Sequence, residues 1–285
     1  MTPVTLPAAL PPRIDAGRLR QRAAILHALR TTLHDTGFLE VQPPTIVDGP
    51  ALEETLEPVH ADGRYLHTSP EFALKRVLAA GLPRIYSIVP CFRDEEWGTH
   101  HAREFTMLEL YFANAGYLDL IPVVEGLVAA SARAIAVPAP VFERRTVESL
   151  FDGDIPDDDD TFFLRWVDRI EPTLTAPTFV LDYPARHAAL AEVRGEVSER
   201  LEVYLGGLEL GNGFSELRDP DELRARFHTS AARRIAAGRR PHPVDEGVIA
   251  ASAHMPRAAG IAIGVDRLVM ALTGEPDIAH VQVSR

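Results

Sequence analysis

Charged and aromatic side chains are concentrated in the segment CFRDEEWGTHHAREFTMLELY, residues 91–111. Its pattern predicts a strand–loop–strand hairpin, with Arg93 leaving the first strand and Phe105 on the second. An arginine can bind phosphate while an aromatic ring stacks on a base, so the hairpin suits a nucleoside triphosphate. An ordinary surface hairpin with ion pairs explains the same residues equally well. This segment alone leaves both interpretations open.

A second segment, GIAIGVDRL (260–268), places an arginine after a strand of small residues. Small residues let a ligand approach the backbone, and Arg267 stands at the junction between this strand and a helix. Arg267 is therefore a candidate for binding phosphate. The alternative is an arginine that pairs with Asp266 or another acidic neighbour.

A third segment, LEVYLGGLELGNGFSEL (201–217), contains carboxylates on both sides of a Gly-Gly turn. The turn folds Glu202 and Glu209 onto neighbouring strands, where two carboxylates can hold Mg2+. Beyond the turn, Asn212, Phe214 and Glu216 alternate with a period of two and share one face. Such a face suits a ligand with an ammonium group, although a half-buried strand is the alternative.

The elements that must position these residues follow from hydrophobic periodicity and turn signals. Apolar residues at Leu19, Ala23, Leu26, Leu29 and Leu33 predict one face of a helix that ends at Gly37. A short helix capped at Thr68 or Ser69 and a second one over 118–136 are also expected. Strands are predicted at 84–93, 104–115, 177–184 and 260–264, with a hairpin turn at Gly206–Gly207. The fold class is therefore α+β, a mainly antiparallel sheet flanked by helices.

The composition limits the class of protein. The 285 residues carry a formal net charge of −12, whereas proteins that bind nucleic acids usually present a basic surface. The single cysteine, Cys91, excludes an internal disulfide and is expected to be a small buried hydrophobic residue. The sequence has no apolar run of the roughly 18 residues that a membrane-spanning helix needs. It also has no secretory signal pattern at its N-terminus. We therefore expect a cytoplasmic protein without membrane contact.

Three local features receive ordinary interpretations. The basic stretch 226–240 is predicted to be the solvated face of a helix. The aspartates at 157–160 are predicted to lie in an exposed loop without a function. Lys75 is the only lysine among 29 basic residues, which the codon bias of a GC-rich genome explains best. A contact that arginine cannot make is the second interpretation of Lys75.

Taken together and in order, these segments resemble the signature motifs of class II aminoacyl-tRNA synthetases. GFLEVQPPTI (37–46) is similar to motif one, with Pro44 at the dimer-interface proline, FRDEEWGTHHAREF (92–105) to motif two and GIAIGVDRL to motif three. TSPEFALKR, EFTMLELY and LELGNGFSEL are close to the lysyl-tRNA synthetase versions. The resemblance covers most of residues 15–275 and implies a homodimer.

Within that branch, the chain resembles the bacterial elongation factor P lysine ligases. The motifs begin too early for an N-terminal OB-fold anticodon domain, so residues 1–285 are expected to form one catalytic domain after a leader at 1–14, and tRNA is not the expected partner. The resemblance implies that ATP and Mg2+ activate (R)-β-lysine, or lysine, for transfer to a lysine side chain of elongation factor P. Ala262 replaces the glycine that is usual in lysyl-tRNA synthetases, and an added methyl group would select the lysine isomer.

The resemblance also implies roles residue by residue. Arg93, Glu95 and Arg267 would be catalytic, with Arg93 on the α-phosphate, Arg267 on the γ-phosphate and Phe105 stacked on adenine. The ATP site would comprise Arg93, Asp94, Glu95, His101, Ala102, Phe105, Glu209, Leu210, Gly264 and Arg267. The amino-acid pocket would comprise Ser69, Pro70, Glu71, Glu109, Tyr111, Asn212, Phe214, Glu216 and Ala262. Glu202 and Glu209 would hold Mg2+.

The chain departs from the family pattern in two places. Ala102 and Arg103 replace an asparagine and a proline of the ATP loop, and Asp94 replaces an asparagine. Residues 114–176 form a shortened insertion. These departures motivate two alternatives: a lysyl transferase with another acceptor, such as a carrier protein or small molecule, and a binding protein without catalysis.

Overall fold

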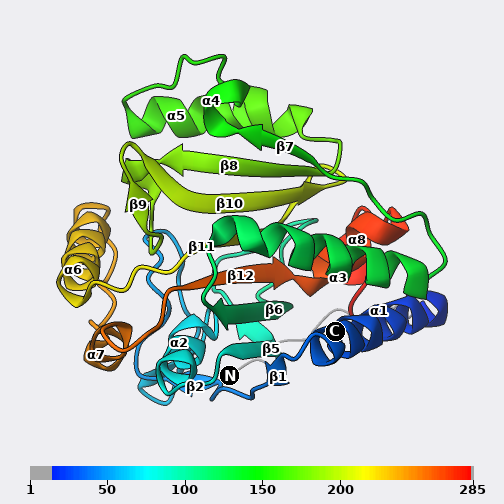
Figure 1. The fold of residues 1–285 in the computed structure, drawn as a ribbon, viewed down its shortest axis with the longest axis horizontal. Coiled ribbons are helices and arrows are strands. Elements are labelled where there is room, and N and C mark those ends of the chain that lie inside the picture. The colour runs from blue at the N-terminus through cyan, green and yellow to red at the C-terminus, as the bar shows by residue number, and fades with distance from the viewer. Residues whose placement is uncertain (1–14, 284–285) are drawn as a thin grey trace, which may run out of the picture.

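The computed structural model describes residues 15–283, so the leader expected at 1–14 lies outside the described residues. Their core is a nine-stranded sheet, shown in Figure 1, in which every pairing is antiparallel except β1 with β5 and β7 with β8. Along the sheet the order is β1 (Leu39–Glu40), β5 (Arg84–Phe92), β6 (Glu104–Ala113), β12 (Ala258–Gly264), β11 (Leu208–Ser215), β10 (Val197–Leu205), β8 (Thr178–Pro184) and β7 (Glu143–Thr146), and β9 (Val193–Arg194) pairs with β10. The predicted fold class is confirmed.

Smaller elements complete the described residues. A three-stranded sheet has the order β2 (Ile46–Val47), β4 (Arg64–Leu66) and β3 (His60–Ala61). The helices are α1 (Ala16–Asp35), α2 (Glu71–Ala79), α3 (Leu120–Ala134), α4 (Val147–Leu150), α5 (Asp159–Arg165), α6 (Pro220–Ala236), α7 (Glu246–Ser252) and α8 (Val265–Thr273). None of the helices in residues 15–283 has the length and apolar character to cross a membrane.

The large sheet is amphipathic because successive side chains of each strand point to opposite faces. On one face, Leu110 of β6, Ile261 of β12 and Val203 of β10 are buried in one cluster with residues of α1, α3 and α8. Each fully buried aliphatic side chain stabilises the fold by roughly 1.5–3 kcal/mol. The buried stripe of α1 is Ile25, Leu29 and Leu33, whereas Ala23, predicted to lie on that face, is exposed.

The turn between β10 and β11 follows the prediction. Gly206 and Gly207 have φ values of 63° and 77°, the conformation that a two-residue hairpin turn with positive φ at both positions requires. Leu205 and Leu208 are paired on either side of it. The turn thereby fixes which residues of β10 and β11 lie opposite each other.

The N-terminus of α2 differs slightly from the prediction. Its N-cap position is Pro70, which lacks a capping side chain, whereas Thr68 or Ser69 was expected. The hydroxyl of Ser69 nevertheless accepts a hydrogen bond of 3.0 Å from the backbone N–H of Glu71. Ser69 therefore satisfies one free donor of the first turn from one position further out.

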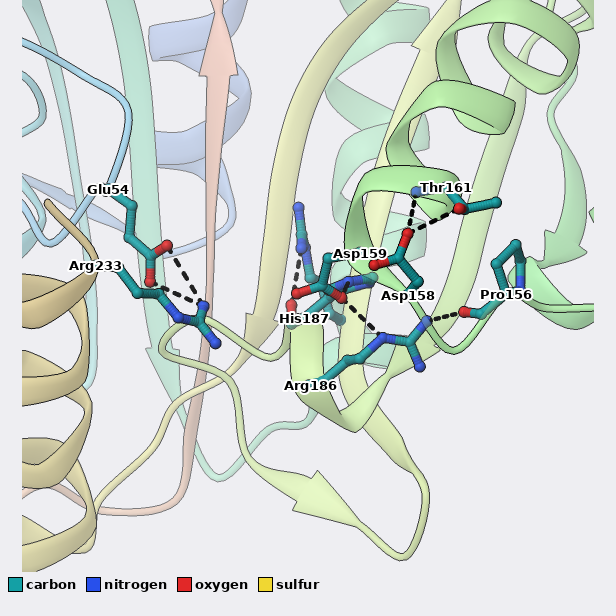
Figure 2. Close-up of polar contacts among 9 residues, drawn as sticks. Glu54, Pro156, Asp158, Asp159, Thr161, Arg186, His187 and Arg233 are labelled. Carbon is teal, nitrogen blue, oxygen red and sulfur yellow. Dashed lines mark hydrogen bonds and ion pairs between the residues drawn. The ribbon is translucent and has the colours of Figure 1, made fainter. Parts of the chain in front are cut away.

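The aspartate run is ordered by local contacts, as Figure 2 shows, and the loop prediction is wrong for part of it. Asp158 is the N-cap of α5 and accepts hydrogen bonds from the backbone N–H and hydroxyl of Thr161, at 2.8 and 2.7 Å. Asp159, in the first turn of α5, accepts from Arg186 at 2.9 Å and lies 2.8 Å from His187 Nε2. These carboxylates begin a helix and tie it to the residues after β8.

The prediction of a solvated face for the basic stretch is wrong at Arg234. This side chain of α6 is 1% exposed and donates to the carbonyl oxygens of Glu54 and Leu56 at 2.8 and 3.0 Å. It also forms an ion pair of 2.8 Å with Glu57. Arg234 therefore fixes the loop over residues 53–57, while Arg233 pairs with Glu54 at the surface (Figure 2).

Candidate active site

Most of the predicted site residues lie on or over the face of the large sheet opposite α1 and α3, whereas the side chain of Leu210 is buried in the cluster with those helices. Antiparallel register places residues of neighbouring strands side by side, so they form rows across the sheet. Glu109, Ala262, Asn212 and Glu202 form one row, and Tyr111, Gly260, Phe214 and Arg200 form the next. Side chains more than 100 positions apart in the sequence thereby become neighbours.

A cavity of about 320 Å³ lies on this face. Most of the residues predicted for the site are on its wall: Ser69, Glu71, Arg93, His101, Ala102, Phe105, Glu109, Tyr111, Glu202, Glu209, Leu210, Asn212, Phe214, Ala262, Gly264 and Arg267. Four predicted residues, Pro70, Asp94, Glu95 and Glu216, are not on the wall. The volume is within the range of small-molecule sites.

One end of the cavity is acidic. Glu109 is the most buried carboxylate on the wall at this end. Glu109 is 1% exposed and accepts hydrogen bonds from the hydroxyls of Ser69 and Tyr111, the latter at 3.0 Å. Burial and, secondarily, the nearby charge of Glu71 raise the pKa of Glu109 to about 8. A cationic ligand would favour the charged form of this carboxyl group.

Glycine at position 260 makes room for the ring of Tyr111. A Cβ atom there would lie 2.2 and 2.3 Å from two ring carbons of Tyr111 and 2.7 Å from Oε1 of Glu216. Those separations are shorter than non-bonded contacts permit. The small residues of motif three therefore serve packing within the site as well as access for a ligand.

The other end of the cavity carries the arginines. The guanidinium of Arg93 lies over the ring of Phe105, 5.0 Å from its centroid, and its Nη1 is 3.5 Å from Glu96. Arg267 donates to the backbone oxygen of Glu209 at 2.8 Å, and its Nη2 lies 2.7 Å from Nε2 of His101. Arg267 therefore links the hairpin loop to the β11 strand.

Arg267 does not pair with its neighbour Asp266, which was the alternative interpretation. Asp266 is buried and bound instead to Arg22, at 2.5 Å, and to the backbone N–H of Thr106, at 2.6 Å. Burial and the charge of Arg267 lower the pKa of His101, so this histidine is a neutral acceptor for the guanidinium.

Two carboxylates lie between the two ends. Glu202 accepts hydrogen bonds from Arg200 at 2.6 Å and from the hydroxyl of Tyr204 at 2.8 Å. Glu209 faces it from β11, and burial together with Glu202 raises the pKa of Glu209 to about 7. Among the described residues, no cluster of three or more histidine, cysteine, aspartate or glutamate side chains has the arrangement of a metal site.

The hairpin departures pair with one another. Arg103 forms an ion pair of 2.7 Å with Asp94, and its guanidinium lies over the ring of Trp97, 5.6 Å from the centroid. Glu95 has a φ of 65° and is not on the cavity wall, and its carboxylate lies 3.7 Å from Arg239. An ion pair across the loop thus replaces the asparagine and proline of the family pattern.

Sequence reasoning missed several residues of the wall, among them Glu53 and Arg200. Arg200 donates to the side-chain oxygen of Asn212 at 3.0 Å and thereby orients the Asn212 amide. Its spacing of two from Glu202 on a strand was a usable signal, since both share one face. Glu53 lies in a loop, where periodicity gives no signal.

The family can now be stated from comparison with known proteins. A model of the family described as tRNA synthetases class II (D, K and N) matches residues 15–283. The chain belongs to this class II synthetase family, which confirms the resemblance inferred from the three motifs.

Curated relatives give the nearer similarity. The elongation factor P–(R)-beta-lysine ligase of Pectobacterium carotovorum subsp. carotovorum is 38% identical over 91% of this chain and 92% of that protein. The proteins of the same name from Photorhabdus laumondii and Vibrio cholerae are 37% and 35% identical, each over 95% of both chains. The similarity to the elongation factor P lysine ligases is thereby confirmed.

Proposed function

We propose that this protein is a ligase that uses ATP to activate (R)-β-lysine as an aminoacyl-adenylate and transfers it to a lysine side chain of elongation factor P. The names of its relatives and the class II synthetase family support the reaction class. The observation that carries the proposal is a single cavity with carboxylates at one end, arginines at the other and Ala262 in the row between Glu109 and Asn212.

The acidic end suits a substrate with two ammonium groups. Glu71 and Glu109 both face the cavity, and each can accept charge-assisted hydrogen bonds. The methyl group of Ala262 occupies space beside Glu109, where the amino group of the two lysine isomers differs in position. In a well-packed pocket, one methyl group changes the difference in binding free energy between two substrates by roughly 1–3 kcal/mol.

The arginine end suits a triphosphate. Arg93 and Arg267 supply fixed positive charge, and the ring of Phe105 supplies a stacking surface for a base. Charge that develops on the phosphates in the transition state is stabilised by such fixed donors without reorganisation. Both arginines belong to elements held by the same sheet.

The carboxylates Glu202 and Glu209 fit Mg2+ in the chemistry of their donor set. Both are oxygen ligands on neighbouring strands, and burial together with the charge of Glu202 raises the pKa of Glu209 to about 7 although Arg267 and Arg200 lie nearby. Mg2+ bound there would neutralise phosphate charge, with the phosphates supplying further oxygen ligands.

The chemistry then proceeds in two steps. The carboxylate oxygen of the amino acid attacks the α-phosphorus, the bond from that phosphorus to the bridging oxygen breaks, and pyrophosphate leaves. The acceptor amine next attacks the carbonyl carbon, AMP leaves, and the new amide nitrogen loses a proton. These steps need positioning and charge neutralisation, not a protein nucleophile. Cys91 is consistent with this, since it is 0% exposed and burial raises the pKa of its thiol.

ATP–pyrophosphate exchange tests the proposal. Purified protein with Mg2+ is assayed with (R)-β-lysine, L-lysine or no amino acid, and the fastest exchange is expected with (R)-β-lysine. Labelled (R)-β-lysine is then offered to elongation factor P, to its variant without the acceptor lysine, and to an unrelated carrier protein. Absence of exchange with every lysine isomer would leave the binding-protein alternative, and labelling of only the carrier protein would favour another acceptor.

We also propose a homodimer. Leu39 and Ile46, on either side of the motif-one proline Pro44, are 51% and 46% exposed, and a second copy of the chain that docks at motif one would cover both side chains. Light scattering after size exclusion should give twice the mass of one chain, and Leu39→Asp should shift the protein toward the monomer. A monomer at micromolar concentration would contradict the proposal.

A further inference from the structure

The single lysine of the chain lies directly behind the acidic end of the cavity. Lys75, in α2, is 4% exposed and is not on the cavity wall. Its ammonium group lies 2.6 Å from Oε1 of Glu71 and 2.7 Å from Oε2 of Glu216, and 5.3 Å from the ring centroid of Phe214. A charged group at this depth is stable only because it is paired on two sides.

The two carboxylates that Lys75 joins have different positions. Glu71 is on the cavity wall, and its Oε1 is bound to Lys75, which leaves its other oxygen for a ligand. Glu216 is 1% exposed and lies one layer behind the wall, against Gly260. Lys75 therefore connects a ligand-facing carboxylate with a fully buried one.

The charges of this end of the site can be counted. Glu71, Glu109 and Glu216 supply three negative charges when ionised, and Lys75 supplies one positive charge. The sum is −3 + 1 = −2, which two ammonium groups of a substrate would balance. Without Lys75, like charges in a buried site would favour protonation of one or more carboxyl groups.

We infer that Lys75 is a positioning residue for the amino-acid substrate: it holds Glu71 in place, favours the ionised forms of the neighbouring carboxyl groups and sets the charge of the fully ionised end to match a substrate with two ammonium groups. This inference rests on the proposed function. Its geometry also explains why arginine is a poor substitute, since the compact ammonium group fits between two carboxylates in a space that a planar guanidinium overfills.

The titration behaviour agrees with this geometry. Burial lowers the pKa of Lys75, but Glu216 and Glu71 outweigh burial, and the net pKa lies above its ordinary value. Burial raises the pKa of Glu216 to about 7 even with Lys75 beside it. The facing groups from the packed elements are Glu109 and Tyr111 of β6, and Glu192 further along the chain adds negative charge near Glu216.

Kinetics of three variants test the role in catalysis. Lys75→Met removes the charge, Lys75→Arg keeps it, and Lys75→Met with Glu216→Gln removes one charge of each sign. Lys75→Met is expected to raise the KM for (R)-β-lysine by about tenfold or more, because each unit of rise in a carboxyl pKa lowers the ionised fraction about tenfold. The KM for ATP should stay within about twofold, and the double variant should recover part of the loss.

The pH profile distinguishes this role from simple structural support. In Lys75→Met the rise of kcat/KM for the amino acid should move to higher pH, whereas a packing defect would lower kcat/KM equally at every pH. Lys75→Arg is expected to keep the wild-type pH profile with a higher KM. Equal losses for ATP and amino acid, an unshifted profile or no recovery in the double variant would overturn the inference.

A spectroscopic measurement keeps the inference testable when turnover is absent. Because the chain has one lysine, protein labelled with ε-13C-lysine gives one side-chain resonance. In wild type this resonance should remain that of an ammonium group at pH 10. In the double variant with Glu71→Gln and Glu216→Gln, the Lys75 resonance should titrate at a lower pH than in wild type. Addition of (R)-β-lysine should shift it, and an ATP analogue alone should not. A resonance that titrates like free lysine, or ignores the amino acid, would refute the role of Lys75 even if the proposed ligase activity were established.

Discussion

The glycine beneath Tyr111 offers the sharpest test of the site geometry. Gly260→Ala adds one methyl group at a position where the nearest atoms are ring carbons of Tyr111 at 2.2 and 2.3 Å. Ordinary contacts of a Cβ atom begin near 3.4 Å, so the ring must move by about 1 Å. The hydroxyl of Tyr111 is then displaced from its 3.0 Å hydrogen bond to Glu109.

Gly260→Ala is expected to lower the free energy of unfolding and to raise the KM for the amino acid. Overpacking of a dense interior costs about 1–3 kcal/mol of the free energy of unfolding. Loss of the hydrogen bond leaves Glu109 with Ser69 as its remaining hydroxyl donor and favours the protonated carboxyl group, because the bond from Tyr111 lowers a pKa that burial raises to about 8. We expect the KM for (R)-β-lysine to rise about tenfold, by the equivalence of one pKa unit to a factor of ten.

Denaturant unfolding and pyrophosphate exchange measure these effects separately. Gly126→Ala, on α3, is the matched control, because apart from the backbone of its own helix no atom of the described residues lies within 4 Å of the added carbon, and alanine favours the helix by about 1 kcal/mol. Gly126→Ala should be at least as stable as wild type, with unchanged KM values. If Gly260→Ala were as stable as wild type and bound the amino acid equally well, the packing of Tyr111 on β12 would be refuted.

Four other outcomes are expected. Ala262→Gly should lower the preference for (R)-β-lysine over L-lysine about tenfold in pyrophosphate exchange, since one methyl group is worth roughly 1–3 kcal/mol; an unchanged ratio would exclude Ala262 as the selector. The kcat/KM for (R)-β-lysine should rise between pH 6 and 8, because Glu109, with a pKa of about 8, must lose its proton to bind an ammonium group, and Glu109→Gln should flatten that rise. Glu209→Gln should weaken Mg2+ dependence and slow exchange about 100-fold, whereas wild-type exchange in the variant would remove Glu209 from the metal site. Wild type incubated with ATP and (R)-β-lysine should gain no adduct on Lys75 by peptide mass spectrometry, because that side chain is 4% exposed, while Arg103→Lys should gain one.

The stability of the unliganded protein should depend on pH in the same window. The carboxyl pKa of Glu109 is about 8 in the folded chain and 4.5 ordinarily, so the folded state binds more protons between these values. Stability therefore falls as pH rises from about 4.5 to 8 by this contribution, and the substrate should stabilise the protein more at pH 8 than at pH 6. A thermal-shift series with and without (R)-β-lysine measures the difference.

Much of the fold could be predicted from the sequence because its signals are local. The helix over residues 16–35, the Gly206–Gly207 turn and the strands that flank it follow from periodicity and glycine placement. The aspartate run was misjudged in two ways: the cap that Asp158 forms with Thr161 is a local signal that was overlooked, and the contacts of Asp159 with Arg186 and His187 arise only when β8 has been placed in the sheet.

The sequence predicted which residues form the candidate site better than it predicted which of them contact each other. Sixteen of the predicted residues lie on one cavity wall, which the motif order anticipated. Their individual roles stay predictions. The motifs could not reveal that Glu216 lies behind the wall or that Asp94 pairs with Arg103, since both depend on side-chain directions after folding.

The sequence by itself determined which chemical groups the protein can present. It also determined the order of the motifs, the alternation of side chains along each strand and the presence of one lysine in an arginine-rich composition. Only the tertiary structure decided which of these groups meet. The register of β6, β12, β11 and β10 sets Glu109, Ala262, Asn212 and Glu202 side by side, and α2 places Lys75 between two of the acids. Strand order and burial bring distant residues into contact and fix their charge states, and neither is encoded in the spacing of any single motif.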